Sequence, residues 1–299
     1  MKKFLQDKVA IVTGAGGGLG RAHALALAAH GARVVVNDLG ADAASAVVDE
    51  IERRGGVAIT NGGNVTDPAA MQAMVDQAMA QWGRVDILVN NAGILRDKSF
   101  AKMTLDDFRL VLDVHVMGAV NCSKAVWDVM RAQQFGRIVM TTSSSGLYGN
   151  FGQANYGAAK LALVGLMQTL AIEGAKHNIR VNCLAPTAAT GMTAGVLPGE
   201  ALRALAPEKV SPALVALVGD DAPTRMILLA GAGSFEAAHI TMTRGLHLDP
   251  EDGDVALQLA ERIDEVQDRR GEVVPAAGWE QYKLELAKAG LLQPEEFSA

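Results

Sequence analysis

A serine, a tyrosine and a lysine near the middle of the chain have the types and spacing needed to move a proton. Tyr156 and Lys160 stand four residues apart in the segment YGAAK, so on a helix they share a face. An ammonium beside a phenol favours the phenolate and lowers the tyrosine pKa from about 10. Ser143 follows the apolar residues 137–140 and precedes Tyr156 by thirteen residues. Both hydroxyls can therefore meet one alcohol oxygen, between a strand end and a helix start.

A bare tyrosine–lysine pair of this spacing is more often two surface side chains of a helix, so the surrounding elements decide the interpretation. The β-branched segment KVAIVT of residues 8–13 leads into GAGGGLG at 14–20, and a helix-forming stretch follows at 21–30. This order is typical of the first unit of a dinucleotide-binding fold, where glycines let the backbone approach a pyrophosphate at a helix N-terminus. We expect Gly14, Gly18, Leu19 and Gly20 to contact that group.

An acidic residue follows the second predicted strand, at 33–37. Asp38 lies about 20 residues beyond the glycines, where a carboxylate can bind the ribose 2′-hydroxyl of NAD and repel the 2′-phosphate of NADP. The alternative is that Asp38 only caps the helix that begins near Ala41. We favour the ribose role, and hence NAD as the cofactor.

Another small and polar cluster, NNAG at residues 90–93, follows the apolar strand VDILV of residues 85–89. Ligands bind at the carboxyl ends of strands in open α/β sheets, so Asn91, Ala92 and Gly93 are candidate cofactor contacts. Taken alone, the cluster could be only a turn.

Strands alternate with helical patterns along most of the chain, which predicts a doubly wound (Rossmann) α/β fold with seven parallel strands and helices on both faces. The expected strands are 8–13, 33–37, 57–60, 85–89, 137–140, 179–184 and 226–230, the sixth ending at Ala185-Pro186. We expect a dehydrogenase domain at 1–239 and a helical extension at 240–299. The long, apolar connection 187–212 is expected to cover the substrate.

Composition sets limits on the function classes. The net charge of −6 argues against non-specific nucleic-acid binding, and no apolar run reaches the ~18 residues that span a bilayer. The two cysteines, Cys122 and Cys183, lie in apolar segments and suggest reduced, buried thiols. No spacing of Cys and His suggests a metal site. These features predict a cytoplasmic protein without a metal or a membrane partner.

Together these motifs resemble the short-chain dehydrogenase/reductase family, in the family's order from residue 8 to about 235. The resemblance implies that Tyr156 is the general acid/base, that Ser143 positions the substrate oxygen, and that Lys160 holds the nicotinamide ribose and lowers the tyrosine pKa. It also implies that Asn91 lies near the cofactor ribose, and that the residues from Pro186 and Thr187 onward touch the nicotinamide.

Two positions depart from the family pattern. Asn64-Val65 stands where the family usually has Asp-Val at the adenine edge, a role that the asparagine amide oxygen can still take. His115 stands where the family has an asparagine that supports a water in a proton relay to the lysine. Whether His115 does the same is left open by the sequence.

Within the family, the segments VVVNDLG (34–40), GLYGNFGQANYGAAK (146–160) and LAIEGAKHNIRVNCLAP (170–186) resemble the dehydrogenase units of peroxisomal multifunctional enzymes. That resemblance implies NAD-dependent oxidation of (3R)-3-hydroxyacyl-CoA to 3-ketoacyl-CoA, by a homodimer. The chain ends in Phe297-Ser298-Ala299 without a peroxisomal signal, so a free-standing relative is expected. The alternatives are a hydroxysteroid dehydrogenase, a 3-ketoacyl-carrier-protein reductase, or a non-catalytic NAD-binding sensor.

Overall fold

The computed structural model describes residues 4–189 and 203–291 and divides the chain into two units, 1–238 and 239–299. Each unit is described by itself below. Half of the predicted substrate loop, including Met192, Ala194, Val196, Leu197 and Leu202, lies outside the described residues.

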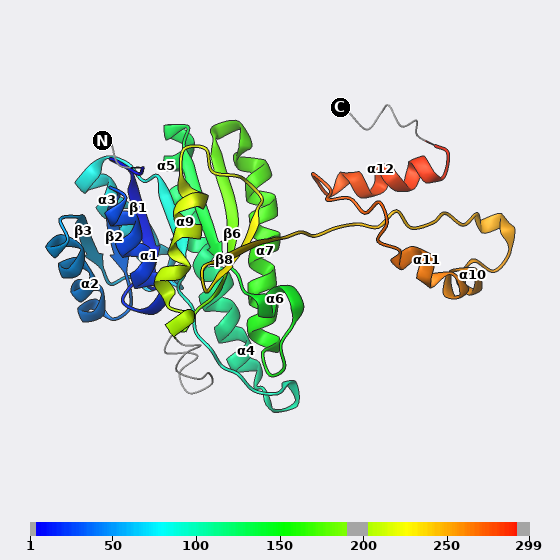
Figure 1. Cartoon of the computed structure of the whole chain (residues 1–299), viewed down its shortest axis with the longest axis horizontal. Helices are drawn as coiled ribbons and strands as arrows, with labels where there is room; N and C mark the ends of the chain where they lie inside the picture. Colours follow the sequence, from blue (N-terminus) through cyan, green and yellow to red (C-terminus); the bar gives the residue numbers. More distant parts are fainter. Residues whose placement is uncertain (1–3, 190–202, 292–299) are drawn as a thin grey trace. The chain divides into compact units, whose positions relative to one another are not determined.

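Unit 1 is built on one sheet with helices on both faces, as predicted (Figure 1). The strand order is β3-β2-β1-β4-β5-β6-β7-β8, and every pair from β3 to β7 is parallel. β1 and β5 are buried along their whole length, because helices cover both faces of the sheet. The strands are β1 (Val9–Thr13), β2 (Arg33–Asn37), β3 (Val57–Asn61), β4 (Ile87–Asn90), β5 (Gly136–Thr141), β6 (Ile179–Thr187), β7 (Ile227–Gly231) and β8 (Ser234–Ala238).

Two separate apolar cores lie on the two faces of this sheet. One contains buried side chains of α1 (Gly18–Ala29), α2 (Ala41–Arg53) and α9 (Ser211–Val218). The other contains those of α3 (Pro68–Trp82), α5 (Gly118–Gln133) and α7 (Ala154–Gly174). Strand order reverses between β1 and β4, and such a reversal opens a crevice at the carboxyl ends of the strands.

The prediction of seven strands missed the last one. β8 pairs antiparallel with β7 through a two-residue turn, Ala232-Gly233, in which both residues have positive φ (53° and 83°). This is the conformation of a tight hairpin turn, which brings the chain straight back along β7. The sequence SFEAA of β8 contains no β-branched residue and therefore gave no strand signal.

The predicted end of the sixth strand is also wrong. β6 continues through Pro186 to Thr187, and Pro186 is in register with Ala230 of β7. Proline fixes φ near −65°, which an extended strand end can accept. The consequence is that Thr187 is held by the sheet at the carboxyl edge.

Unit 2 contains short helices where one long polar helix was expected at residues 250–270. A 3₁₀ turn (Pro250–Asp252), α10 (Val255–Glu261) and α11 (Ile263–Gln267) follow one another. The Asp249 carboxylate accepts a backbone N–H group at the start of the 3₁₀ turn, and the Asp254 carboxylate accepts two at the start of α10. Each aspartate therefore caps the beginning of a new helix. α12 (Trp279–Lys288) lies where the second helix was predicted.

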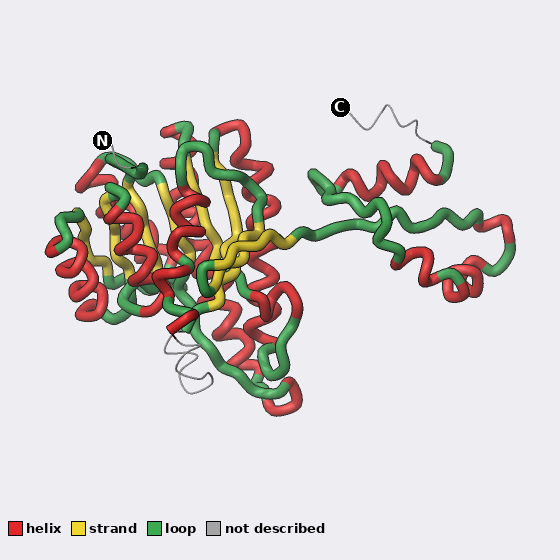
Figure 2. The backbone as a smooth tube through the Cα atoms, in the orientation of Figure 1, coloured by secondary structure: helices red, strands yellow, loops and turns green. Residues whose placement is uncertain are grey.

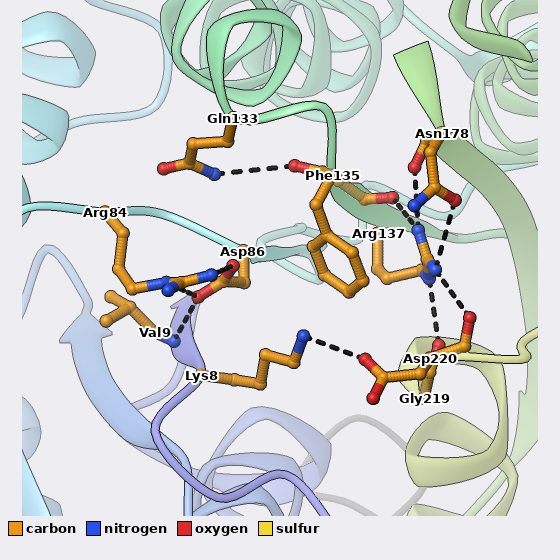
Figure 3. Close-up of polar contacts among 11 residues, drawn as sticks. Lys8, Val9, Arg84, Asp86, Gln133, Phe135, Arg137, Asn178, Gly219 and Asp220 are labelled. Carbon is orange, nitrogen blue, oxygen red and sulfur yellow. Dashed lines mark hydrogen bonds and ion pairs between the residues drawn. The ribbon is translucent and has the colours of Figure 1, made fainter. Parts of the chain in front are cut away.

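The amino-terminal edge of the sheet is held by a buried arginine (Figure 3). The Arg137 side chain is fully buried, and its guanidinium donates to the carbonyl oxygens of Gly136, Asn178, Gly219 and Asp220. Its central carbon lies 4.0 Å from the ring centroid of Phe135. Burial lowers the pKa of Arg137 to about 10. This network lies at the opposite strand ends from the crevice and serves to hold the fold.

One helical stretch, Ala154–His177, has the length and mean hydropathy of a membrane span. It contains α7, whose inner face packs against the sheet core. Length and composition alone are weak evidence for a span, since a core helix passes the same test.

Candidate active site

A cavity of about 580 Å³ opens at the carboxyl ends of the strands and brings most of the predicted site residues together. The glycine loop after β1, the segments after β4 and β5, the start of α7 and the end of β6 all contribute. Its predicted members are Gly14, Gly18, Leu19, Gly20, Asp38, Asn91, Ala92, Gly93, His115, Ser143, Tyr156, Lys160, Pro186 and Thr187.

Ser143 and Tyr156 meet in this cavity from two different helices. Ser143 caps the short helix α6 (Ser144–Tyr148), where its hydroxyl accepts the backbone N–H of Ser145 at 3.2 Å. Tyr156 lies in the first turn of α7, and the Ser143 side chain is close enough to its phenol to oppose the effect of burial on the phenol pKa. The two hydroxyls therefore form one polar point at which a substrate oxygen can be held.

Lys160 lies one turn further along α7, with its side chain buried. Its ammonium donates to the carbonyl oxygen of Thr141 at 2.6 Å and lies 5.4 Å from the ring centroid of Tyr156. Burial lowers the pKa of Lys160 to about 7. Near neutral pH this lysine can therefore hold or release a proton.

The expectation that the tyrosine pKa falls is not met in this structure. Burial raises the pKa of Tyr156, and the nearby Ser143 side chain opposes that rise only in part. The physical reason is that Lys160 is turned toward the backbone of Thr141, while the phenol is removed from water.

His115 lies beside the catalytic candidates, on a π-helical turn (Asp113–Met117) between α4 (Leu105–Leu112) and α5. Its ring meets that of Tyr156 edge to face, with centroids 5.3 Å apart. Nε2 lies 2.8 Å from the carbonyl oxygen of Ile94, and buried Nδ1 has no partner within the described residues. Burial, and then the charge of Lys160, lower the pKa of His115 to about 3, so the ring is neutral. Single π-helical turns often occur at functional sites.

The glycine loop fits the pyrophosphate of a dinucleotide. α1 begins at Gly18 without an acidic residue in its first turn, so free backbone N–H groups face the cavity. Gly20 has no room for a side chain, because a Cβ there would lie 2.1 Å from the carbonyl oxygen of Gly14. Asp38 accepts the N–H groups of Gly16 (2.9 Å) and Gly40 (3.0 Å), so its carboxylate lies against this loop.

The segment after β4 is tied to the glycine loop. The Asn91 amide donates to the carbonyl oxygens of Thr13 and Gly14, at 2.9 and 3.1 Å. The Thr13 hydroxyl accepts the N–H groups of Asn91 and Ala92. Thr13 was not predicted as a site residue, although it is the polar last residue of an apolar strand.

Asn64 and Val65 do not line this cavity. The Asn64 side chain accepts the backbone N–H of Thr66 at 3.0 Å, and the Val65 carbonyl accepts the Asn121 amide at 2.9 Å. The lining also includes residues that were not predicted as site residues, among them Leu95, Asn150 and Gln153. They lie in loops, and the fold alone brings them to the cavity.

Comparisons with known proteins agree with this geometry. The family model of the short chain dehydrogenases matches residues 8–200. The peroxisomal hydratase-dehydrogenase-epimerase of Saccharomyces cerevisiae is 48% identical over 256 residues, which are 82% of this chain and 28% of the yeast protein. A Mycobacterium tuberculosis protein named as a short-chain type dehydrogenase/reductase is 46% identical over 87% of this chain and 95% of its own length.

Solved structures are also similar. The full-length peroxisomal multifunctional enzyme type 2 of Drosophila melanogaster has a TM-score of 0.79 and 37% identity, over 95% of this chain and 51% of that one. A 7α-hydroxysteroid dehydrogenase complexed with NADH and a bile-acid ketone has a TM-score of 0.72 and 34% identity, over 77% of this chain and 95% of that one. With its glycine loop, its cavity and these relatives, the chain belongs to the short-chain dehydrogenase/reductase family.

Proposed function

We propose that this protein oxidises (3R)-3-hydroxyacyl-CoA thioesters to 3-ketoacyl-CoA with NAD. The observation that carries the proposal is a single cavity lined both by the glycine loop with Asp38 and by Ser143, Tyr156 and Lys160. The substrate class in this proposal is supported by the similarity to relatives named as peroxisomal hydratase-dehydrogenase and multifunctional enzymes. A bound nicotinamide would accept the hydride from C3 of the substrate.

The residues of this chain supply the rest of the chemistry. Ser143 holds the 3-hydroxyl, and Tyr156 removes its proton as C3 becomes a ketone. Lys160 binds the nicotinamide ribose. Neutral His115 supports the relay that returns the proton to solvent through Lys160. Asp38 binds the adenosine ribose, and its charge disfavours NADP.

The direct test is NADH formation from (3R)- and (3S)-3-hydroxyacyl-CoA of several chain lengths, with Tyr156→Phe as the inactive control. We expect turnover of the 3R form only. Preference for the 3S form, or activity on a free steroid alcohol without activity on any thioester, would move the assignment to a hydroxysteroid dehydrogenase. Faster NADPH-dependent reduction of a 3-ketoacyl carrier protein would indicate the reductase instead. Tight NAD binding without turnover of any alcohol would indicate a sensor.

We also propose a homodimer. The described helices of unit 2 bury none of their residues, while large apolar side chains such as Leu257, Ile263, Trp279 and Tyr282 are between 40% and 57% exposed. Exposed apolar area of this kind favours association. Light scattering at micromolar concentration should give twice the chain mass, and a monomer would contradict the proposal. We further propose a cytoplasmic location, although the named multifunctional relatives are peroxisomal. Cell fractionation tests this location.

A further inference from the structure

Two segments next to the cavity lie side by side in unit 1 and expose aromatic and charged side chains. One follows β4 and leads to α4, with a short 3₁₀ turn at Phe100–Lys102, and the other joins α6 to α7 (Figure 1; Figure 2). The N–H of Lys98 donates to the carbonyl of Gly152 at 2.9 Å, and the Gln153 amide donates to Asp97 at 2.7 Å. Since Leu95 and Gln153 both line the cavity, the paired loops form one side of its mouth.

Large aromatic rings are exposed in and beside these segments: Phe100 in the 3₁₀ turn, Tyr148 at the end of α6, and Phe151 in the second loop. Phe100, Tyr148 and Phe151 have exposed fractions of 74%, 68% and 91%. The chain contains only thirteen aromatic residues (7 Phe, 3 Trp and 3 Tyr), and three of them lie in or beside these two segments. Exposed aromatic clusters of this kind usually mark a binding surface.

The first segment also contains exposed cations and carboxylates. Arg96, Lys98 and Lys102 are exposed, and so are Asp97 and, in the first turn of α4, Asp106. Lys98 and Arg96 share the carboxylate of Asp107, at 2.9 and 3.9 Å. Lys102 has no ion-pair partner in the part of the chain that the structure describes, so its charge is available to a ligand.

We infer that these six residues, here called the rim (Arg96, Lys98, Phe100, Lys102, Tyr148 and Phe151), bind the nucleotide part of coenzyme A. The inference rests on the proposed function and deepens it. Adenine stacks on aromatic rings, and the phosphates of coenzyme A need cations. The glycine loop and Asp38 occupy the other side of the cavity, so the thioester enters past the rim and its nucleotide stays there.

The rim can be separated from the chemistry by comparing two thioesters with the same (3R)-3-hydroxyacyl group. One is the coenzyme A thioester, and the other is the N-acetylcysteamine thioester, which lacks the nucleotide. For Lys102→Glu we expect KM for the coenzyme A thioester to rise roughly three- to tenfold, with KM for the short thioester unchanged. For Phe151→Ala we expect the same pattern, about fivefold or more. Unchanged turnover of the short thioester shows that each variant is folded.

The matched control is Lys124→Glu, the same charge change at an exposed position on α5. It should leave both KM values unchanged. Added salt should raise KM for the coenzyme A thioester in the unaltered protein and much less in Lys102→Glu.

Equal changes in KM for both thioesters, or no change for either, would contradict the proposal that the rim binds the nucleotide of coenzyme A. Failure of the unaltered protein to oxidise either thioester would instead overturn the proposed function, so the two failures are distinguishable.

Discussion

The absence of a side chain at Gly93 leaves room for the ring of His115. A Cβ at residue 93 would lie 2.2 Å from Cε1 of His115, closer than any real contact. From the sequence, Gly93 is predicted as a cofactor contact, and His115 is a separate departure from the family pattern. In the structure the two residues lie in contact, because the small residue after β4 makes space for the larger ring on the π-helical turn.

The first prediction concerns His115. His115→Asn should keep activity within about threefold, because a shorter amide can still meet the Ile94 backbone, whereas His115→Leu should lose roughly tenfold or more in kcat. Because the pKa of His115 is lowered to about 3, we expect no histidine transition in the kcat profile above pH 5. Equal activity of the two variants, with equal thermal stability, would mean that His115 is only a packing residue.

Tyr156 is the subject of the second prediction. Tyr156→Phe keeps the ring that His115 contacts but removes the transferable proton, so kcat should fall by roughly 10²- to 10⁴-fold while NAD binding persists. NAD affinity by titration calorimetry and NADH formation measure the two effects separately. Tyr282→Phe, at a half-exposed tyrosine of unit 2, is the control and should be neutral. Near-normal turnover of Tyr156→Phe would remove the tyrosine from the mechanism.

The fold and the positions of most candidate residues could be predicted because they depend on local patterns. β1 is an apolar β-branched run, and the glycines follow it directly, so their place at a strand end needs no knowledge of distant residues. The YGAAK spacing likewise fixes Tyr156 and Lys160 on one helix face. These features follow from strand and helix periods alone.

Features that depend on tertiary packing could not be predicted. The direction of the Lys160 ammonium, toward Thr141, depends on where β5 ends relative to α7, and so does the raised pKa of Tyr156. Leu95 and Gln153 line the cavity only because two loops pair across 50 or more residues of chain, as the 56-residue separation of Asp97 and Gln153 illustrates. The periodicity of single segments contains no such information.

The third prediction concerns cofactor choice. Asp38 faces the glycine loop, so kcat/KM should favour NAD over NADP, and Asp38→Ser should narrow the difference by about tenfold. Since Asp38 also accepts two backbone N–H groups, this variant should bind both cofactors somewhat more weakly. Asp42→Asn removes one negative charge from exposed α2 and should leave the preference unchanged. Comparable values for the two cofactors in the unaltered protein would contradict the role of Asp38.

The fourth prediction concerns stability. Arg137→Met should lower the free energy of unfolding by about 3–5 kcal/mol, because four carbonyl groups, two of them in buried hydrogen bonds, would lose their donor. Urea denaturation measures this loss. Arg131→Met breaks only exposed contacts, with Asp128 and His177, and should cost less than about 1 kcal/mol. The residual activity of folded Arg137→Met should be normal, because the cavity lies at the opposite strand ends. A loss no larger than that of Arg131→Met would show that the network does not hold the fold.

The last prediction concerns acid stability, through His23 of α1. This histidine is fully buried, its Nδ1 lies 3.0 Å from the Ser211 hydroxyl of α9, and burial lowers its pKa to about 4. Between pH 6.5 and 4 the unfolded chain binds a proton at this residue and the folded chain does not, so acidification favours unfolding. The contribution of neutral His23 to the free energy of unfolding is fully present above pH 6.5 and should fall by about 1.4 kcal/mol per pH unit between pH 6.5 and 4. His115, whose pKa is also lowered by burial, contributes with the same sign.

His23→Gln removes the titrating group and should make the fall between pH 6.5 and 4 shallower, whatever its effect on stability at pH 8. Urea denaturation at several pH values measures the slope. His30→Gln, at an exposed histidine following the same helix, should leave the slope unchanged. If the unfolding free energy of His23→Gln depends on pH as in the unaltered protein, the buried ring is already protonated in the folded protein. The contact of α1 with α9 through a neutral histidine would then be contradicted.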